Sequence, residues 1–411
     1  MGESPIRPFA HSPIRSANPP APVIIPLMPT YLDYAATTPV HPDVVKAMTP
    51  FFSEDFGNPS SIHRYGQKAE GAVETARERL AGCLRARPDE IVFTSCGSES
   101  DNLALRGAAF AARKDRGANH ILISPVEHHA VSHTAGQLAE VHGFELETLP
   151  VDGFGRVDPD EVARRLRPET AVVSIILANN EIGTINPIRE IAAVCRAAGV
   201  PFHTDAVQAG AHLRLDVAEL GVDLMALGAH KFYGPKGVGA LYIRRGTPLI
   251  PELTGGGQES GRRAGTSNVP YIVGMAAAFE RAQSDLGPHR SHLEPLRDRL
   301  IGSVLETIPT AALTGHPTAR LPNHASFVFK GVDGNALLMS LDVAGFACSS
   351  GSACKTGLPE PSDVLLALGL APEWALGSLR VTLGSGTTPG DISEFLEVLP
   401  RVVADLRRLT G

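Results

Sequence analysis

The stretch PFHTDAVQAGAHLRLDVAELGVDLMALGAHKFYGPKG, residues 201–237, decides the fold. It holds two short apolar runs, Pro201–Asp205 and Leu224–Leu227, and both lead into polar or small residues. Apolar runs of this length, bounded by turn residues, are typical of strands buried on both faces of a sheet. One run ends on Asp205 and the other leads to Lys231. The stretch therefore predicts two strands that deliver a carboxylate and an amine to the sheet edge where ligands bind.

Strand-like and helix-like segments alternate on both sides of this stretch. Residues 67–84 place alanine, valine and leucine at helical spacing, and another helix is expected from about Glu99. The other strand-like runs are Glu90–Ser95, His120–Ser124, Ala171–Leu177 and Gly239–Arg244. This alternation predicts an α/β fold in which a mostly parallel sheet is covered by helices on both faces.

The composition and the order of predicted strands and helices divide the chain into three parts. Residues 1–29 are rich in proline and contain SPIR twice, which predicts a disordered extension. Residues 30–285 carry the strand–helix alternation and predict a large domain, whose first residues can pack on the next one. Residues 286–411 mix helices with shorter strands and predict a small α+β domain.

Composition limits the classes of function. The 411 residues are 43% hydrophobic and 20% charged, with a net charge of -7, as in an ordinary globular protein. This balance favours neither a nucleic-acid partner nor a membrane, and no apolar run approaches a membrane span. The five cysteines form an odd set without a secretory signal, which predicts reduced thiols and a cytoplasmic location. Zinc-type spacing is absent, so we expect no metal site.

The turn TSCGSES, residues 94–100, joins a strand to a helix start. Free backbone N–H groups at Gly97 and the positive end of the helix dipole favour a phosphate there. Ser98 adds a hydroxyl donor. An ordinary helix N-cap is the alternative.

Two further polar groups follow predicted strands. His128 can stack on an aromatic cofactor and move protons near neutral pH, although a surface histidine is the alternative and His129 is the weaker candidate. Asp205 is costly to bury unless it is paired, and a protonated ring nitrogen would pair with it. Gln208 can donate to a ring oxygen. A helix N-cap at Asp205 is the structural alternative.

Lys231 lies between a strand and a glycine-rich turn. A lysine held in a semi-apolar crevice has a lowered pKa and can form a Schiff base. A solvated lysine is the alternative, and Lys236 in its Gly-Pro-Lys-Gly turn fits that description better. Arg380, on a short predicted strand, can clamp a carboxylate with two hydrogen bonds, or else form a structural ion pair.

Residues 348–357, CSSGSACKTG, place Cys354 among small polar residues. Such a run predicts an accessible loop, and the neighbouring Lys355 favours the thiolate. A linker with incidental cysteines is the alternative. Cys348 follows Gly-Phe-Ala and can belong to a strand, so Cys354 is the better nucleophile candidate.

Taken in order, these stretches resemble the cysteine desulfurases of the NifS/IscS type, in the class V aminotransferase group of fold-type-I pyridoxal-phosphate enzymes. The resemblance extends over nearly the whole chain after residue 29. Further matching stretches are YLDYAATTP at 31–39, GNPS at 57–60, ANNEIG at 178–183 and GGGQESGRRAGT at 255–266. The resemblance implies a seven-stranded-type sheet, a homodimer and pyridoxal 5'-phosphate as the cofactor.

Roles for single residues follow from the resemblance. It implies that Lys231 holds the cofactor covalently, that His128 stacks on its ring, and that Asp205 and Gln208 contact the ring nitrogen and the ring hydroxyl. The remaining matches are Gly97, Ser98, His230 and, across the dimer interface, Thr266 for the phosphate, Asn180 and Arg380 for the substrate carboxylate beside the cofactor, and Cys354 as sulfur acceptor. Gly228 stands where the family often has serine, so it is left out of the site.

The resemblance implies a reaction that takes sulfur from L-cysteine, with L-alanine and a persulfide on Cys354 as products. In it, Lys231 moves the Cα proton and His128 takes the thiol proton. A sulfur-acceptor or iron–sulfur scaffold protein would collect the sulfur. A selenocysteine lyase and another class V aminotransferase remain alternatives. A thiol scaffold or metal-binding module would explain the cysteine loop but not the set of Lys231, Asp205 and His128.

Overall fold

The computed structural model describes residues 28–350 and 360–410. The predicted extension lies outside this range except for its last two residues, and Cys354 lies outside it as well. The disorder expected for residues 1–27 therefore stays a prediction.

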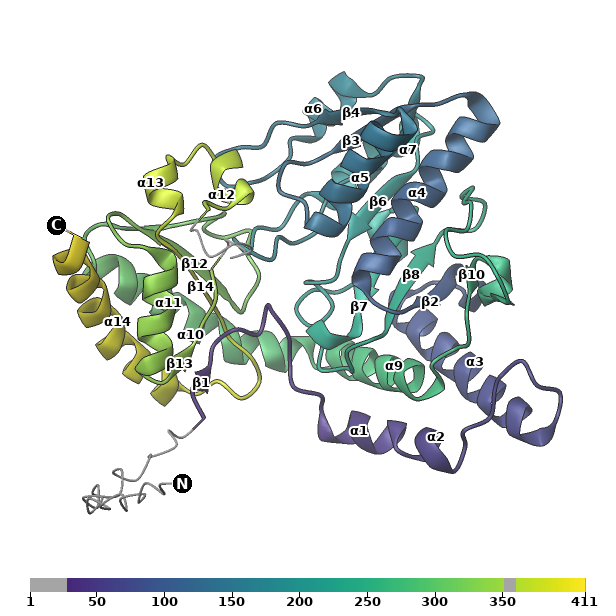
Figure 1. Ribbon diagram of the computed structural model, residues 1–411, viewed down its shortest axis with the longest axis horizontal. Coiled ribbons are helices and arrows are strands. Elements are labelled where there is room, and N and C mark those ends of the chain that lie inside the picture. The colour runs from purple at the N-terminus through teal and green to yellow at the C-terminus, as the bar shows by residue number, and fades with distance from the viewer. Residues whose placement is uncertain (1–27, 351–359, 411) are drawn as a thin grey trace, which may run out of the picture.

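A seven-stranded sheet forms the centre of the chain, with the strand order β2-β8-β7-β6-β5-β3-β4 (Figure 1). Its strands are β2 Ile91–Thr94, β3 His120–Ile123, β4 Glu145–Thr148, β5 Thr170–Ser174, β6 Phe202–Asp205, β7 Leu224–Gly228 and β8 Gly239–Ile243. Only β8 runs antiparallel to its neighbours, and the other neighbouring pairs are parallel. The prediction of a mostly parallel α/β sheet is confirmed.

Strand β4 is the one strand of this sheet that the apolar runs do not indicate. Its sequence is Glu145-Leu146-Glu147-Thr148, and all four side chains are partly or fully exposed. It lies at the sheet edge and pairs with β3 alone. An edge strand needs no continuous apolar run, which explains why the sequence pattern missed it.

Helices cover both faces of the sheet, as predicted (Figure 1). On one face lie α4 Gly97–Arg116 and α5 His129–His142. The opposite face is covered by α1 Pro42–Met48, α3 Arg64–Leu84, α6 Pro159–Arg165, α7 Ile188–Ala197, α8 Val217–Leu220 and α9 Val269–Ser284. Shorter elements are α2 Pro50–Ser53, the 3-10 turns Pro88–Glu90, Ala229–Lys231 and Glu259–Gly261, and the hairpin of β9 Gly257–Gln258 with β10 Arg263–Ala264. Among the described residues, no helix has the length and apolar character needed to cross a bilayer.

A smaller antiparallel sheet, ordered β11-β12-β14, forms a second core. Its strands are β11 Ala311–Leu313, β12 His324–Phe329 and β14 Ser378–Thr382, with α10 Leu286–Thr307, α11 Gly334–Val343, α12 Asp363–Ala367, α13 Pro372–Ala375 and α14 Pro389–Thr410 around them. The first strand, β1 Thr30–Tyr31, pairs with β13 Phe346–Ala347 beside this sheet. Asp285 separates α9 from α10. We propose this point as the boundary between the large and the small domain.

Candidate active site

A cavity of about 240 Å³ lies at the carboxyl ends of β6 and β7. It brings together side chains from both sheets and from the turn before α4. The predicted site residues that line it are Gly97, Ser98, His128, Asn180, Asp205, Gln208, His230, Lys231 and Arg380. Residues that the sequence places up to 283 positions apart, Gly97 and Arg380, thus share one cavity.

Lys231 ends the short 3-10 turn that follows β7. Its Nζ donates to the carbonyl oxygens of Ala35 at 2.5 Å and Ala36 at 2.8 Å. Burial, with the Arg380 guanidinium adding to it, lowers the pKa of Lys231 to about 8, while the Asp205 carboxylate acts in the opposite direction. The amine therefore takes up or releases a proton close to neutral pH, as Schiff-base lysines must.

Asp205 is the last residue of β6 and is buried. Its Oδ1 accepts the backbone N–H of Val207 at 2.8 Å. Burial raises the pKa of Asp205, and His128, the Val207 N–H and the Lys231 ammonium each oppose that rise. A buried carboxylate of this kind is well suited to pair with a cationic ring nitrogen.

His128 caps the N-terminus of α5. Its Nδ1 accepts the backbone N–H of Ala130 at 3.1 Å, so the neutral ring carries its proton on Nε2. The side chain thus presents a donor to its surroundings. To accept a thiol proton, as the sequence predicts, the ring has to release the Ala130 N–H.

The turn that starts α4 is tightly packed and leaves backbone N–H groups without intrahelical partners. A Cβ on Gly97 would lie only 2.6 Å from Val207 Cγ2, so the packing of this turn requires glycine. Cys96 provides the N-cap, and its Sγ accepts the Glu99 N–H at 3.4 Å. The N–H groups of Gly97 and Ser98 precede the first intrahelical hydrogen bonds and remain available to a ligand.

Two polar side chains of the cavity are held by the segment that follows β1. His230 Nδ1 lies 3.2 Å from Thr37 Oγ1. Gln208 donates one amide hydrogen to the carbonyl oxygen of Ala35 at 2.9 Å. Because a side-chain amide has two hydrogens, the second remains for the predicted contact with a ring hydroxyl.

Arg380 lies on β14 and reaches the cavity from the smaller sheet. Its guanidinium forms an ion pair with Asp33 Oδ1 at 2.8 Å and donates to the Asn180 carbonyl oxygen at 3.0 Å. Among the described residues, its buried Nε has no hydrogen-bond partner. The structural ion pair is therefore formed, and the carboxylate clamp stays a prediction.

Thr266 is not part of this cavity. It lines a neighbouring cavity of about 230 Å³ that also contains Ser95 and Arg263. Within one chain Thr266 is thus separate from the other predicted phosphate contacts, as its predicted role across a dimer interface requires.

The two cysteines of the predicted loop differ in what the structure describes. Cys348 follows β13 and packs against the core of the smaller sheet. Burial raises the pKa of its thiol, which disfavours the thiolate. Cys354 lies outside the described residues, so its selection stays a prediction.

Three carboxyl groups next to the site were not among the residues predicted from the sequence. Asp33 pairs with Arg380. Glu127 is buried, accepts the Ser124 hydroxyl and the Ile176 N–H, and has its pKa raised by burial to about 8. Asp101 is 1% exposed.

Of these three groups, Asp101 could have been recognised as buried from the sequence pattern. It precedes Ala104 and Ala108 on α4 by three and seven residues, so it belongs to the apolar face of that helix. An acidic residue in such a stripe indicates a buried carboxyl group.

Comparison with known proteins places the chain among well-defined relatives. The profile of the family Aminotransferase class-V matches residues 30–395. "Cysteine desulfurase IscS" of Dictyoglomus turgidum is 48% identical over 380 residues, 92% of this chain and 96% of the relative. A solved structure described as "NIFS-LIKE PROTEIN" shares 36% identity with a TM-score of 0.86, over 92% of this chain and 100% of that one. "SspA in complex with cysteine" shares 36% identity with a TM-score of 0.75, over 87% and 99%.

Proposed function

The chain belongs to the class-V aminotransferase family and, within it, to the cysteine desulfurases, and from this premise we propose that it removes sulfur from L-cysteine with the help of pyridoxal 5'-phosphate. The observation that carries the proposal is the position of Lys231. A half-buried amine with a near-neutral pKa shares one cavity with the Asp205 carboxylate and the Arg380 guanidinium. Chemistry on an amino acid with this coenzyme requires three such groups. An amine exchanges protons with the substrate, an anion pairs with the coenzyme ring, and a cation binds the substrate carboxylate.

The residues present fit pyridoxal 5'-phosphate. The glycine-dependent turn at Gly97 offers backbone N–H groups for the phosphate, with Ser98 and His230 beside it. Asp205 provides the buried anion for the ring nitrogen, and Lys231 provides the amine for covalent attachment. When bound, the pyridoxal ring supplies a sink for the electron pair left on the Cα of the amino acid.

The chain's own groups then bind the substrate and move its protons. The Arg380 guanidinium, which lines the cavity next to Asn180, binds the L-cysteine carboxylate. Lys231, with a pKa lowered to about 8 by burial, takes the proton from Cα and later returns one. His128 donates from Nε2, and it can take the thiol proton once the Ala130 N–H is released.

Cys354 is the proposed acceptor of the sulfur. Its thiolate attacks the substrate sulfur, a S–S bond forms, and the C–S bond of the substrate breaks. The carbon fragment takes up a proton and leaves as L-alanine, and Cys354 keeps a persulfide. The partly buried Cys348, whose thiol pKa is raised, is a poor competitor for this step.

The first test addresses Lys231. Reduction of the reconstituted yellow protein with borohydride should attach the coenzyme irreversibly to the peptide containing Lys231, as read by mass spectrometry. Lys231→Ala should abolish alanine release from L-cysteine, and the matched control Lys236→Ala should retain it. A colourless protein after reconstitution, or a coenzyme attached to Lys236, would contradict the proposal.

The second test addresses the sulfur. Cys354→Ala should keep the coenzyme colour and lose persulfide formation, whereas Cys348→Ala should keep both. Full activity of Cys354→Ala would instead indicate a class V aminotransferase. Turnover of selenocysteine but not cysteine would identify a selenocysteine lyase.

We further propose that the protein works as a cytoplasmic homodimer and passes sulfur to an iron–sulfur scaffold or other acceptor protein. The separation of Thr266 from the main cavity supports a dimer in which this residue serves the other subunit. Sedimentation should give twice the chain mass of 43.4 kDa. Thr266→Ala should weaken coenzyme binding without dissociating the dimer. Sulfide release that does not change when a scaffold protein is added would contradict the acceptor assignment.

A further inference from the structure

A cluster of buried titratable groups lies beside Asp205 and is not used by the proposed reaction. Asp101 on α4 and Asp205 on β6 are both buried, and ligand atoms of Asp101, Asp205 and His128 all lie within 4.8 Å of one another. Two carboxylates this close in a low-dielectric interior cannot both ionise without a large penalty. One of the two therefore holds a proton.

The surroundings decide which carboxyl group holds it. Asp205 accepts the Val207 N–H and faces the Lys231 ammonium and His128, and all three favour its ionised form. Burial and the neighbouring acidic groups disfavour the ionised form of Asp101, and no cation is among the groups that shift its pKa. The titratable groups around it are Asp205 on β6, Glu127 after β3, Cys96 at the start of α4 and His128 at the start of α5, with the neutral His203 also facing it from β6. The proton therefore resides on Asp101.

The other side of Asp101 faces a fully buried imidazole. Asp101 Oδ1 lies 3.4 Å from His203 Nε2, and in the described part of the chain neither atom has a hydrogen-bond partner. The Nδ1 of His203 lies 2.8 Å from the Ser174 hydroxyl. Burial lowers the pKa of His203 to about 3, so the ring is neutral and carries one proton. With that proton on Nε2, Nδ1 accepts from the Ser174 hydroxyl, and the 3.4 Å contact of Nε2 with Asp101 is electrostatic, because its alignment falls short of a hydrogen bond.

We propose that Ser174, His203 and Asp101 form a relay, the Asp101 relay, in which Asp101 is a neutral carboxyl group that donates its proton to the Asp205 carboxylate. The relay fixes the orientation of Asp205 and sets how strongly Asp205 attracts a proton on the coenzyme ring nitrogen. Asp101 is thus a positioning residue that acts through Asp205. This role rests on the proposed function, whereas the location of the proton on Asp101 does not.

Two substitutions of Asp101 separate a neutral group from a charged one. Asp101→Asn replaces one neutral donor by another, so the pH midpoint of the bound coenzyme's absorbance should stay within about 0.3 pH units of wild type. Asp101→Ala removes the donor and makes Asp205 more basic, so the midpoint should rise by about 0.5 pH units or more, and coenzyme affinity should fall about tenfold. A midpoint that falls in Asp101→Asn, or stays unchanged in both variants, would overturn the proposal.

If Asp101→Ala does not fold, two matched hydroxyl substitutions, Ser174→Ala and Thr170→Ala, test the rest of the relay. Ser174→Ala removes the hydroxyl that fixes His203 and should raise the midpoint, by less than Asp101→Ala does. Thr170→Ala removes the corresponding hydroxyl next to His120, far from the cavity, and should leave the midpoint unchanged. Equal effects of the two hydroxyl deletions would contradict the relay.

The location of the proton can be measured without the coenzyme. Infrared difference spectra of the coenzyme-free full-length chain, wild type minus Asp101→Asn, should contain the C=O band of a protonated carboxyl group at pH 7. A carboxylate band in its place would overturn the proposal. If this band is present but the protein never binds pyridoxal 5'-phosphate, the proposed function fails while the protonated Asp101 stands.

Discussion

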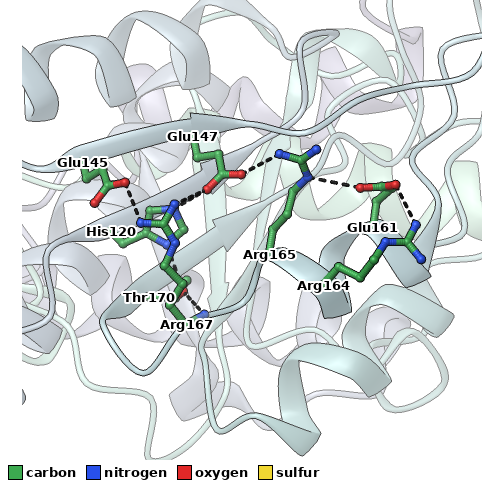
Figure 2. A network of polar contacts seen from close by, with 8 residues as sticks. All are labelled: His120, Glu145, Glu147, Glu161, Arg164, Arg165, Arg167 and Thr170. Carbon is green, nitrogen blue, oxygen red and sulfur yellow. Dashed lines mark hydrogen bonds and ion pairs between the residues drawn. The ribbon is translucent and has the colours of Figure 1, made fainter.

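Two fully buried histidines of the central sheet, His120 and His203, have similar partners and different surroundings. At the amino ends of the strands, His120 Nδ1 lies 3.0 Å from Thr170 Oγ1 and its Nε2 lies 3.3 Å from Glu147 Oε2 (Figure 2). The Asp101 relay, near the carboxyl ends, has the same geometry, with an imidazole between a hydroxyl and a carboxyl group. The difference lies in what surrounds the carboxyl group.

Cations surround the carboxyl group next to His120. Arg165 and Arg167 each lie 2.6 Å from a Glu147 oxygen, and Figure 2 shows that these contacts continue to Glu145 and Glu161. Hydrogen bonds from Arg165 and Arg167 lower the pKa of Glu147, which is only partly buried. We call this set, with His120, Arg164 and Thr170, the edge network.

The comparison shows that cations and solvent, more than the histidine, determine what such a group can do. In the edge network the carboxylate is ionised and its charge is neutralised, so the histidine has a structural role. In the cavity the Asp101 carboxyl group is almost fully buried and has no arginine or lysine among the groups that act on it, so a proton must neutralise it. A proton held in this way is available to tune a neighbouring catalytic group.

The largest expected effect is a difference in enzymatic activity between substitutions of the two ionised carboxylates, Asp205 in the cavity and Glu147 in the edge network. Asp205→Asn should lower alanine release by about a thousandfold or more, because a neutral amide cannot stabilise a proton on the ring nitrogen. Glu147→Gln should leave kcat/KM within about twofold, since its role is confined to a partly exposed network. Steady-state assays on L-cysteine check both. A comparable loss of activity in Glu147→Gln would abolish the distinction.

A second prediction concerns how the free energy of unfolding depends on pH. Glu127 beside the cavity and Glu147 in the edge network should change it in opposite directions. Burial raises the pKa of Glu127 from 4.5 to about 8, so between these values the folded protein keeps a proton that the unfolded chain has lost. Its contribution to stability is therefore complete below pH 4.5 and is lost as the pH rises through 8. Glu127→Gln should remove about 2–4 kcal/mol of the decrease in unfolding free energy between pH 5 and 8.

The matched control is Glu147→Gln. The lowered pKa of Glu147 makes its contribution present above pH 4.5 and lost as the pH falls below that value. The glutamine variant should therefore differ from wild type in its acid dependence and not between pH 5 and 8. Denaturation midpoints of both variants and of wild type, measured across pH, test this prediction. The assignment would be contradicted if both variants showed the same pH dependence of stability.

The same comparison explains which parts of the site the sequence could predict. Lys231 and Asp205 follow continuous apolar runs, so the runs themselves indicated where the strands end. The relay was not predicted, because Ser174 and His203 lie inside strands and their side-chain partners depend on how neighbouring strands and α4 pack. Pairing across a sheet is a long-range property that no local pattern contains.

A third prediction compares the two histidines directly. His203→Asn should lower the unfolding free energy by about 2–3 kcal/mol, since it removes the buried hydrogen bond with Ser174 and the contact with Asp101. His120→Asn should lower it by about 1 kcal/mol, because arginines and solvent can still satisfy Glu147. The pH midpoint of the coenzyme absorbance should move only in the His203 variant. Chemical denaturation and the absorbance titration measure the two effects independently.

The smallest effect concerns the arginines of the edge network. The Arg165 side chain is 36% exposed and bonds to both Glu147 and Glu161, whereas Arg164 is 59% exposed and bonds to Glu161 alone. Arg165→Gln should lower the unfolding free energy only slightly at low salt, because exposed ion pairs gain little beyond their solvation. Most of that loss should disappear in about 1 M NaCl, where the Debye length is near 3 Å. Arg164→Gln should show no measurable change. A loss in Arg165→Gln that salt does not reduce would mean that Glu147 is effectively buried, and the contrast with Asp101 would then rest on neighbouring cations alone.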